Sequence, residues 1–208
     1  MVTKMVGELD DWGDADLGGN DFMKLEEGNN VVRIFTKPYQ FYTVWTTDAT
    51  GKQRKVRSAV ENCPLVQRGE KPSARWYVGV LDRRNGGKPS ILEIGPQIYK
   101  QILGLRKKGT WGDPRAYDVD IERQPKGSQP LYIISPEPKA NLTVEEKTSI
   151  REFLGKIDLV KMTEAPTPEE VREQLGISEP VDVAVNDDFD DFGSDSAETE
   201  DDFDFNNV

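Results

Sequence analysis

Residues 75–82 of this chain read RWYVGVLD, the pattern of a half-buried β-strand. Successive side chains of a strand point to opposite faces, so Trp76, Val78 and Val80 share one face and the residues between them share the other. The more apolar face is expected to line the core. The sequence therefore predicts that Trp76 is buried and that Tyr77 points outward.

Further strands are expected on both sides of this one. β-Branched and aromatic residues are concentrated at 31–36 and 39–47, and residues 52–60 are expected to return as the second arm of a hairpin. The remaining expected strands are 90–94, 117–124 and 131–134.

Helices are expected at two places in the chain. Pro96 stands where a first helical turn tolerates proline, and the cations before Gly109 are typical of a helix C-terminus. Beyond residue 138, Thr-x-x-Glu capping boxes that begin at Thr143 and Thr167 predict two more short helices. This order predicts a mainly β fold, an OB-fold-like Greek-key barrel with a bridging helix and a short helical appendix. An SH3-like barrel is the alternative.

Charge is partitioned along the chain, which the net charge of −11 hides. Residues 28–139 hold twenty Lys or Arg and ten Asp or Glu, whereas residues 181–208 hold eleven acidic residues and no basic one. Unrelieved like charge and low hydrophobicity cannot repay the entropy of ordering, so disordered acidic ends are expected. The expected domains are an acidic flexible arm (1–27), an OB-fold nucleic-acid-binding core (28–139), a helical appendix (140–178) and a disordered acidic tail (179–208).

The composition excludes several kinds of chemistry. Histidine is absent, which removes the usual general base and most zinc sites, and Cys63 is the only cysteine, so no internal disulfide can form. We expect no metal and no cofactor. The chain has no run of 18 apolar residues and no basic-then-apolar leader, so we expect a cytoplasmic protein with no membrane partner.

The basic central region interleaves cations with aromatic residues. Unpaired nucleic-acid strands are held by cations along their backbone and by rings on which bases stack. The predicted phosphate contacts are Arg33, Arg54, Lys55, Arg57, Arg75, Lys107 and Lys108, and the predicted stacking rings are Tyr42, Trp45, Tyr77 and Trp111. The alternative for each ring is a place in the barrel core, where aromatic residues usually lie.

The acidic end repeats an Asp-Asp-Phe unit. Its carboxylates resemble a phosphate backbone, and its rings resemble bases, so the segment is expected to compete with a nucleic acid for the basic groove and to bind partner proteins. A segment that only aids solubility is the alternative. The residues expected to act in this way are Asp187, Asp188, Phe189, Asp191, Phe192, Asp201, Asp202, Phe203 and Phe205.

The chain resembles the single-stranded-DNA-binding proteins of tailed bacteriophages. The resemblance lies in the order of four stretches, LEEGNNVVRI (25–34), NCPL (62–65), KPSARWYVGVLDR (71–83) and ILEIGPQIY (91–99), together with the acidic end. It implies an OB-fold core that coats single strands in replication, recombination and repair, in the cytoplasm of a bacterial host. It also implies that the tail holds replication proteins such as a polymerase or a helicase.

The chain departs from that family in two respects. Relatives often carry a His/Cys zinc site after the second strand, whereas only Cys63 stands there, so the loop is expected to be held by packing instead. Some relatives use a basic N-terminal arm for neighbour contacts, but residues 1–27 are acidic. Self-association on DNA is expected only if this arm docks on the basic groove of an adjacent copy.

Two other functions fit parts of the sequence. Asp118, Asp120 and Glu122 share one face of an expected strand and could hold Mg²⁺ in a nucleic-acid-processing enzyme. The simple alternative is that these carboxylates form the solvated face of an alternating strand. A protein-interaction or DNA-mimic factor, in which the acidic ends are the whole function, is the other candidate.

Overall fold

The structure of the protein is a computed structural model that describes residues 21–48, 50–126 and 130–176. The chain divides into two units, Met1–Ser178 and Glu179–Val208, and all of the described residues belong to the first. The predictions for residues 1–20 and for the acidic tail lie outside the described residues.

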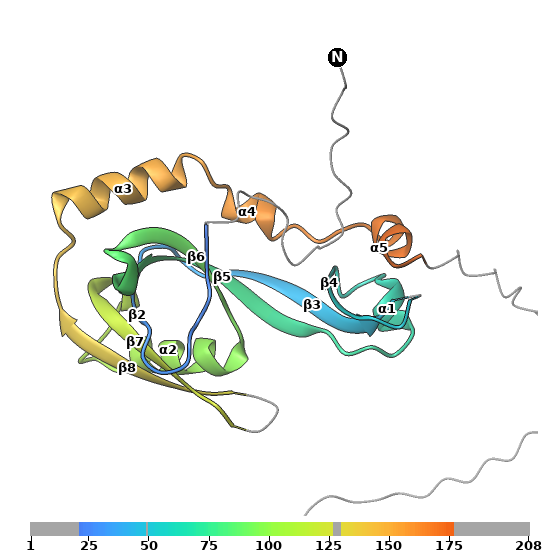
Figure 1. Ribbon diagram of the computed structural model, residues 1–208, viewed down its shortest axis with the longest axis horizontal. Helices are drawn as coiled ribbons and strands as arrows, with labels where there is room; N and C mark the ends of the chain where they lie inside the picture. Colours follow the sequence, from blue (N-terminus) through green and yellow to red (C-terminus); the bar gives the residue numbers. More distant parts are fainter. Residues whose placement is uncertain (1–20, 49, 127–129, 177–208) are drawn as a thin grey trace, which may run out of the picture. The chain divides into compact units, whose positions relative to one another are not determined.

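The described residues form a mainly β fold, as the sequence predicts. Eight strands in this part of the chain belong to one sheet in the order β1-β6-β5-β2-β7-β8, with β3 paired to β4 and to β5 (Figure 1). Among the pairings of these described strands, β1 with β6 is parallel and the others are antiparallel. The strands are β1 Phe22–Met23, β2 Val31–Ile34, β3 Tyr39–Thr47, β4 Gln53–Ser58, β5 Ser73–Asp82, β6 Lys88–Ile94, β7 Tyr117–Gln124 and β8 Leu131–Lys139.

The connectivity fits the OB arrangement. Strand β2 lies between β5 and β7, so the chain must cross over to complete the sheet, and α2 (Pro96–Lys107) bridges β6 and β7. Phe22–Met23, within the stretch 1–27 that was expected to be a flexible arm, forms β1 and pairs with β6.

The interior of the barrel is an apolar cluster built from alternate residues of the strands and one face of α2. Trp76 belongs to it, is 8% exposed, and stacks on Tyr99 of α2 with ring centroids 4.0 Å apart. The prediction for Trp76 is therefore confirmed. The clustered residues that α2 contributes are Ile98 and Ile102, with Tyr99 packed against them.

The outer face of β5 is also covered, which corrects the prediction for Tyr77. Its side chain is 6% exposed and lies in a second cluster with Phe41, Ile91 and Phe153. The covering residues come from α3 (Val144–Leu154) and α4 (Leu159–Met162), and α4 was not predicted. Period-two alternation identifies the two faces of a strand, but it does not reveal that a later segment returns to cover the outer one.

The C-terminal helices, predicted as a short helical appendix, pack against the strands. Both predicted capping boxes are present, at the starts of α3 and α5 (Pro168–Leu175). Val171 and Leu175 of α5 are buried against the β3–β4 hairpin, in a cluster that also contains Cys63 and the short helix α1 (Pro64–Gln67). Apolar packing therefore holds the loop around Cys63.

An ion-pair network attaches α3 to the barrel. Arg33 of β2 is 2% exposed and pairs with Asp118 of β7, which also pairs with Arg83 at 2.7 Å. Arg83 in turn pairs with Glu146 in the first turn of α3. Burial alone would raise the pKa of Glu146, but hydrogen bonds from Arg83 and from the Thr143 amide hold that pKa below its ordinary value.

Leu175→Ala should destabilise the protein, because it leaves a cavity between α5 and the hairpin. Leu175 is 3% exposed, and large-to-small substitutions at such sites cost about 2–5 kcal/mol. Urea unfolding of the whole protein measures the free energy of unfolding. Leu154→Ala is the matched control, since Leu154 is 43% exposed and its truncation should change that free energy by about 0.5 kcal/mol or less. Equal losses in the two variants would contradict the packing of α5.

Acid should weaken the attachment of α3. A carboxylate whose pKa is lower in the folded than in the unfolded chain contributes stability above the unfolded value, here about 4.5, and loses that contribution as pH falls through the folded value. We expect Glu146→Gln to reduce the fall in unfolding free energy between about pH 5 and pH 3. Glu152→Gln, on the exposed side of α3, serves as the control. Identical pH profiles for Glu146→Gln and the parent protein would refute this role.

Candidate nucleic-acid interface

The strand register places five of the predicted contact side chains on one face of the sheet. Residues directly paired across neighbouring strands point to the same face. Such pairs link Trp45 to Lys55, Thr43 to Arg57, Phe41 to Arg75, and Tyr77 to Glu93. We call the accessible part of this surface the hairpin face, and it consists of Trp45, Lys55, Arg57, Arg75 and Glu93.

The hairpin face is concave. Lys55 lies on β4 and Glu93 on β6, and these strands are separated in the sheet by β3 and β5. The Lys55 Nζ and Glu93 Oε2 atoms are nevertheless 2.9 Å apart. The hairpin must therefore curl over the outer side of β5 and β6.

Trp45 is the most exposed ring on this face. Its exposed fraction is 53%, whereas Tyr77 on the same face is buried beneath the helices. Lys55 is paired with Trp45 in the strand register, and the Arg57 guanidinium lies over the rings of Phe41 and Tyr77, at 5.8 and 6.0 Å from their centroids. Burial raises the pKa of Tyr77, against the opposing charge of Arg57, so this ring stays neutral and serves as support for the cation.

A groove of about 570 Å³ continues from Arg75 and Glu93. It passes the first residues of α2 and reaches Tyr132 of β8. The N-terminal turn of a helix presents unpaired backbone amides and a positive potential, which favour an anion. The groove is lined by Leu25, Ser73, Arg75, Glu93, Gly95, Pro96, Gln97, Ile98, Pro130 and Tyr132.

Several predicted contact residues lie elsewhere. Arg33 is buried in its pair with Asp118 and Tyr77 lies beneath the helices, so neither side chain is available to a ligand, and both predictions are corrected. Tyr42 and Arg54 lie on the opposite side of the hairpin by the same alternation. Arg54 pairs there with Asp48, and hydrogen bonds from Thr50 and Arg54 hold the pKa of Asp48 well below its usual range.

The third predicted cluster is at the far end of α2. Lys107 and Lys108 are exposed there, whereas Trp111 is partly buried and its ring packs against Tyr117 with centroids 5.5 Å apart. Lys107 follows Pro96 by eleven residues, so about 16 Å of helix separate these lysines from the groove. The structure therefore brings Trp45, Lys55, Arg57 and Arg75 to one face, with the buried Tyr77 ring beneath Arg57, and leaves the other predicted residues apart.

Two residues of the interface were missed. Glu93 is paired with Tyr77 in the β5–β6 register, so the alternation of residues 90–94 could have predicted which face of the sheet Glu93 lies on. The contact between Glu93 and Lys55 could not have been predicted in this way, because it depends on the curl of the hairpin. Tyr132 reaches the groove only because β8 folds back beside α2.

The carboxylates proposed to hold Mg²⁺ have other partners. They share one face of β7, as predicted, but Asp118 pairs with Arg33 and Arg83, and Asp120 accepts hydrogen bonds from the Asn29 side chain and the Asn30 amide. Across the residues that the structure describes, no group of three His, Cys, Asp or Glu side chains is arranged to hold a metal ion. Asp118 and Asp120 thus tie β7 to β2 and to the residues just before it, and Glu122 accepts a hydrogen bond from Gln124 on its own strand.

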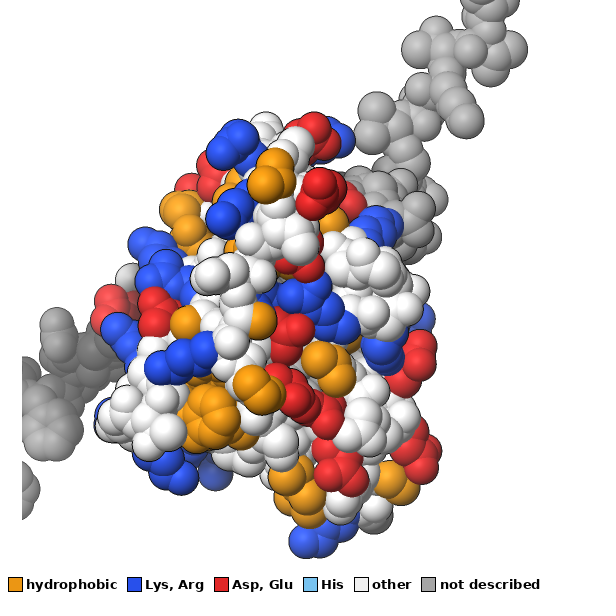
Figure 2. Space-filling model, turned by 90° about the vertical axis from the view of Figure 1, so that its left-hand side faces the viewer, with side chains coloured by type: hydrophobic (Ala, Val, Ile, Leu, Met, Phe, Trp, Pro, Cys, Tyr) orange, Lys and Arg blue, Asp and Glu red, His pale blue; other side chains and the backbone are white. Residues whose placement is uncertain are grey.

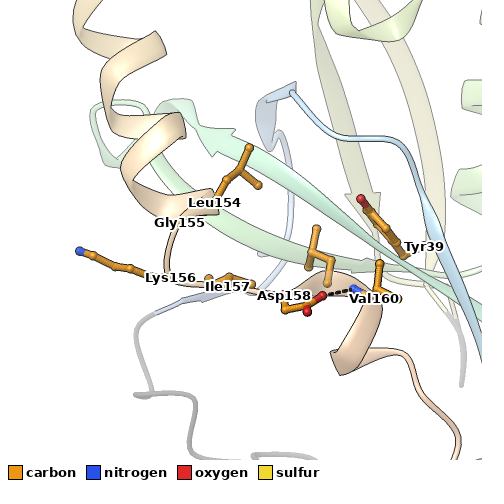
Figure 3. Close-up of a pocket in the computed structure, with 8 residues that line it drawn as sticks. Tyr39, Leu154, Gly155, Lys156, Ile157, Asp158 and Val160 are labelled. Carbon is orange, nitrogen blue, oxygen red and sulfur yellow. Dashed lines mark hydrogen bonds between the residues drawn. The ribbon is translucent and has the colours of Figure 1, made fainter.

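A second hollow, of about 440 Å³, lies at the turn between α3 and α4 (Figure 3). Leu154 and Val160 are exposed beside it, and Tyr39 forms one wall. Its one carboxylate, Asp158, already accepts the backbone amides of Val160 and Lys161 at 3.0 and 3.1 Å as the cap of α4. This hollow lacks the cluster of cations that the hairpin face has.

The barrel end seen in Figure 2 carries mixed charge. Lys and Arg side chains are interspersed there with Asp and Glu side chains, and no large area of one sign is visible. A polyanion gains little from such a surface, because neighbouring opposite charges cancel within a Debye length.

Comparison with known proteins gives one distant similarity. No model of a known protein family matches the chain. Over 183 residues it is 23% identical to a protein of Escherichia phage T5 named "Probable ssDNA-binding protein", and the alignment covers 72% of this chain and 70% of that protein. None of the helices in the described part of the chain is both long and apolar enough to cross a membrane.

Proposed function

We propose that the protein binds single-stranded DNA on the hairpin face without chemical change to the strand. The observation that carries this proposal is the exposed Trp45 ring beside Lys55 and Arg57 on the concave side of the sheet. A ring flanked by cations is what an unpaired base and its phosphate require. The similarity to the phage T5 protein supports the same ligand.

The arrangement favours single strands over duplexes and tolerates any sequence. Stacking uses the π-face that every base has, and this face is free only when the base is unpaired. The strand is proposed to run from Trp45 past Lys55 and Arg75 into the groove beside Tyr132. Lys107 and Lys108 contribute if the strand continues along α2.

The wider role follows from the resemblance to phage single-strand-binding proteins. We propose that the protein coats and protects single strands during replication, recombination and repair in a bacterial cytoplasm. The acidic tail, residues 179–208, is proposed to recruit replication proteins such as a polymerase or a helicase, and to compete with DNA for the hairpin face. A flexible tether gives such a tail a millimolar effective concentration, as a rough value. Contacts between neighbouring copies through the acidic arm, residues 1–27, are a further proposal.

Trp45→Ala should weaken binding to oligo-dT, because it removes the stacking platform. Base stacking on an aromatic side chain contributes about 1–3 kcal/mol, which corresponds to about a 5- to 150-fold rise in Kd. Fluorescence anisotropy of a labelled oligo-dT measures Kd, and oligo-rU and duplex DNA are titrated in parallel.

Tyr42→Ala is the control for this substitution, since Tyr42 lies on the same strand with its side chain on the opposite side of the hairpin. Its Kd should match that of the parent protein. The hairpin face is excluded as the binding surface if Tyr42→Ala is the damaging change and Trp45→Ala is not.

Removal of residues 181–208 should tighten binding to oligo-dT at low salt, because a competing polyanion is lost. Each neutralised phosphate contributes about −0.7 to the slope of log K against log salt, so five contacts give about −3 to −4. A variant that keeps the carboxylates but replaces Phe189, Phe192, Phe203 and Phe205 with Ser separates the effect of the rings from that of the charge.

The competing explanations give different results for the truncated protein. An unchanged affinity would mean that the tail only aids solubility. A complete loss of DNA binding would favour the interaction or DNA-mimic factor, in which the acidic ends are the whole function.

A further inference from the structure

The Glu93 carboxylate lies between two cations of the hairpin face. Its oxygens are 3.0 and 2.9 Å from the Lys55 Nζ atom, and Oε1 is 3.8 Å from the Arg75 Nε atom. The three side chains are 27–29% exposed, so solvent and a ligand can reach all of them. An anion thus already occupies the point on this face where two positive charges meet.

This carboxylate leaves Arg75 incompletely satisfied. A separation of 3.8 Å is too long for a hydrogen bond, and the Arg75 Nε atom is buried without a hydrogen-bond partner among the described residues. The guanidinium lies against Gly95, where an added Cβ would be 2.7 Å from the Nη1 atom. Arg75 is therefore held at the mouth of the 570 Å³ groove with a donor unused.

A phosphodiester meets the requirements of this position better than a carboxylate does. Its two non-bridging oxygens share one negative charge and, with the ester oxygens, surround a tetrahedral centre, so they can face an ammonium and a guanidinium from different directions. Arginine presents several donors in a planar fork that suits phosphate, and lysine acts as a compact charge.

We propose that Lys55 and Arg75 form a phosphate-binding site that the Glu93 carboxylate occupies in the free protein. This inference rests on the proposed binding of single-stranded DNA and assigns one phosphate contact within it. When the strand binds, a phosphate replaces the Glu93 carboxylate between the two cations. Glu93 therefore sets how tightly the face holds DNA, because each binding event must break its ion pairs.

The test compares Glu93→Gln with the parent protein in titrations of oligo-dT across a salt series. Glutamine keeps the size and one oxygen of glutamate but lacks the charge. We expect about two- to fivefold tighter binding, the range expected for loss of a partly exposed ion pair. The slope of log K against log salt should steepen by about 0.7 at most, because the site takes a single phosphate. Glu152→Gln makes the same change of charge on α3 and should have no such effect.

A second pair of variants tests whether Glu93 acts through Lys55. In the Lys55→Met background, Glu93→Gln should give a smaller gain in affinity than in the parent protein, because one of the two freed cations is missing. Glu93→Asp, which shortens the side chain by one methylene and loosens the pair, should also tighten binding and remains informative if Glu93→Gln folds poorly.

The outcomes separate this inference from the function on which it rests. If the parent protein does not bind oligo-dT at low salt, the proposed function fails and the phosphate site fails with it. If the parent protein binds but Glu93→Gln has the same Kd and salt slope, the function stands and the role of Glu93 is wrong. An equal gain with and without Lys55 would also overturn it.

Discussion

Strand β5 is paired along its edges with β2, β3 and β6, and it is covered on both faces from Trp76 to its end. The inner face packs on the barrel core, and α3 and α4 pack over the outer face. Only the first residues of β5, which end at Arg75, remain partly exposed. On the outer side of β5, the surface left open to a ligand is therefore the start of the strand, the hairpin that curls over it, and the groove that continues to α2.

The attachment of α3 over the outer face of β5 depends on arginines that would otherwise be free to bind a nucleic acid. Arg33 and Arg83 are used to hold Asp118 and Glu146, and Arg84 pairs with Asp82 and Glu26. The excess of ten positive charges over residues 28–139 is thus a poor measure of the field that a nucleic acid would meet. Arg33, Arg83 and Arg84 contribute to the fold in this way, whereas Lys55, Arg57 and Arg75 face the curled side of the sheet.

The function proposed here requires binding chemistry alone. Trp45 supplies a ring, neighbouring cations supply charge, and the carboxylates of β7 are already committed to contacts within the barrel. A carboxylate and a phosphate compete for the same donors wherever both can reach them. Two sets of carboxylates are proposed to compete with DNA phosphates for the cations of the hairpin face. Glu93 does so from within the folded surface, and the acidic tail does so as a flexibly attached segment.

The sequence by itself determined the mainly β fold, most of the strands, the bridging helix and both capping boxes, because these depend on local periodicity and on side chains within one turn. It also placed Trp45, Lys55, Arg57 and Arg75 among the candidates. Only the tertiary structure decided that Tyr77 and Arg33 are buried, that α4 exists, and that Glu93 meets Lys55. The physical reason is that burial and ion pairing depend on which distant segments return to a strand, and periodicity carries no information about that return.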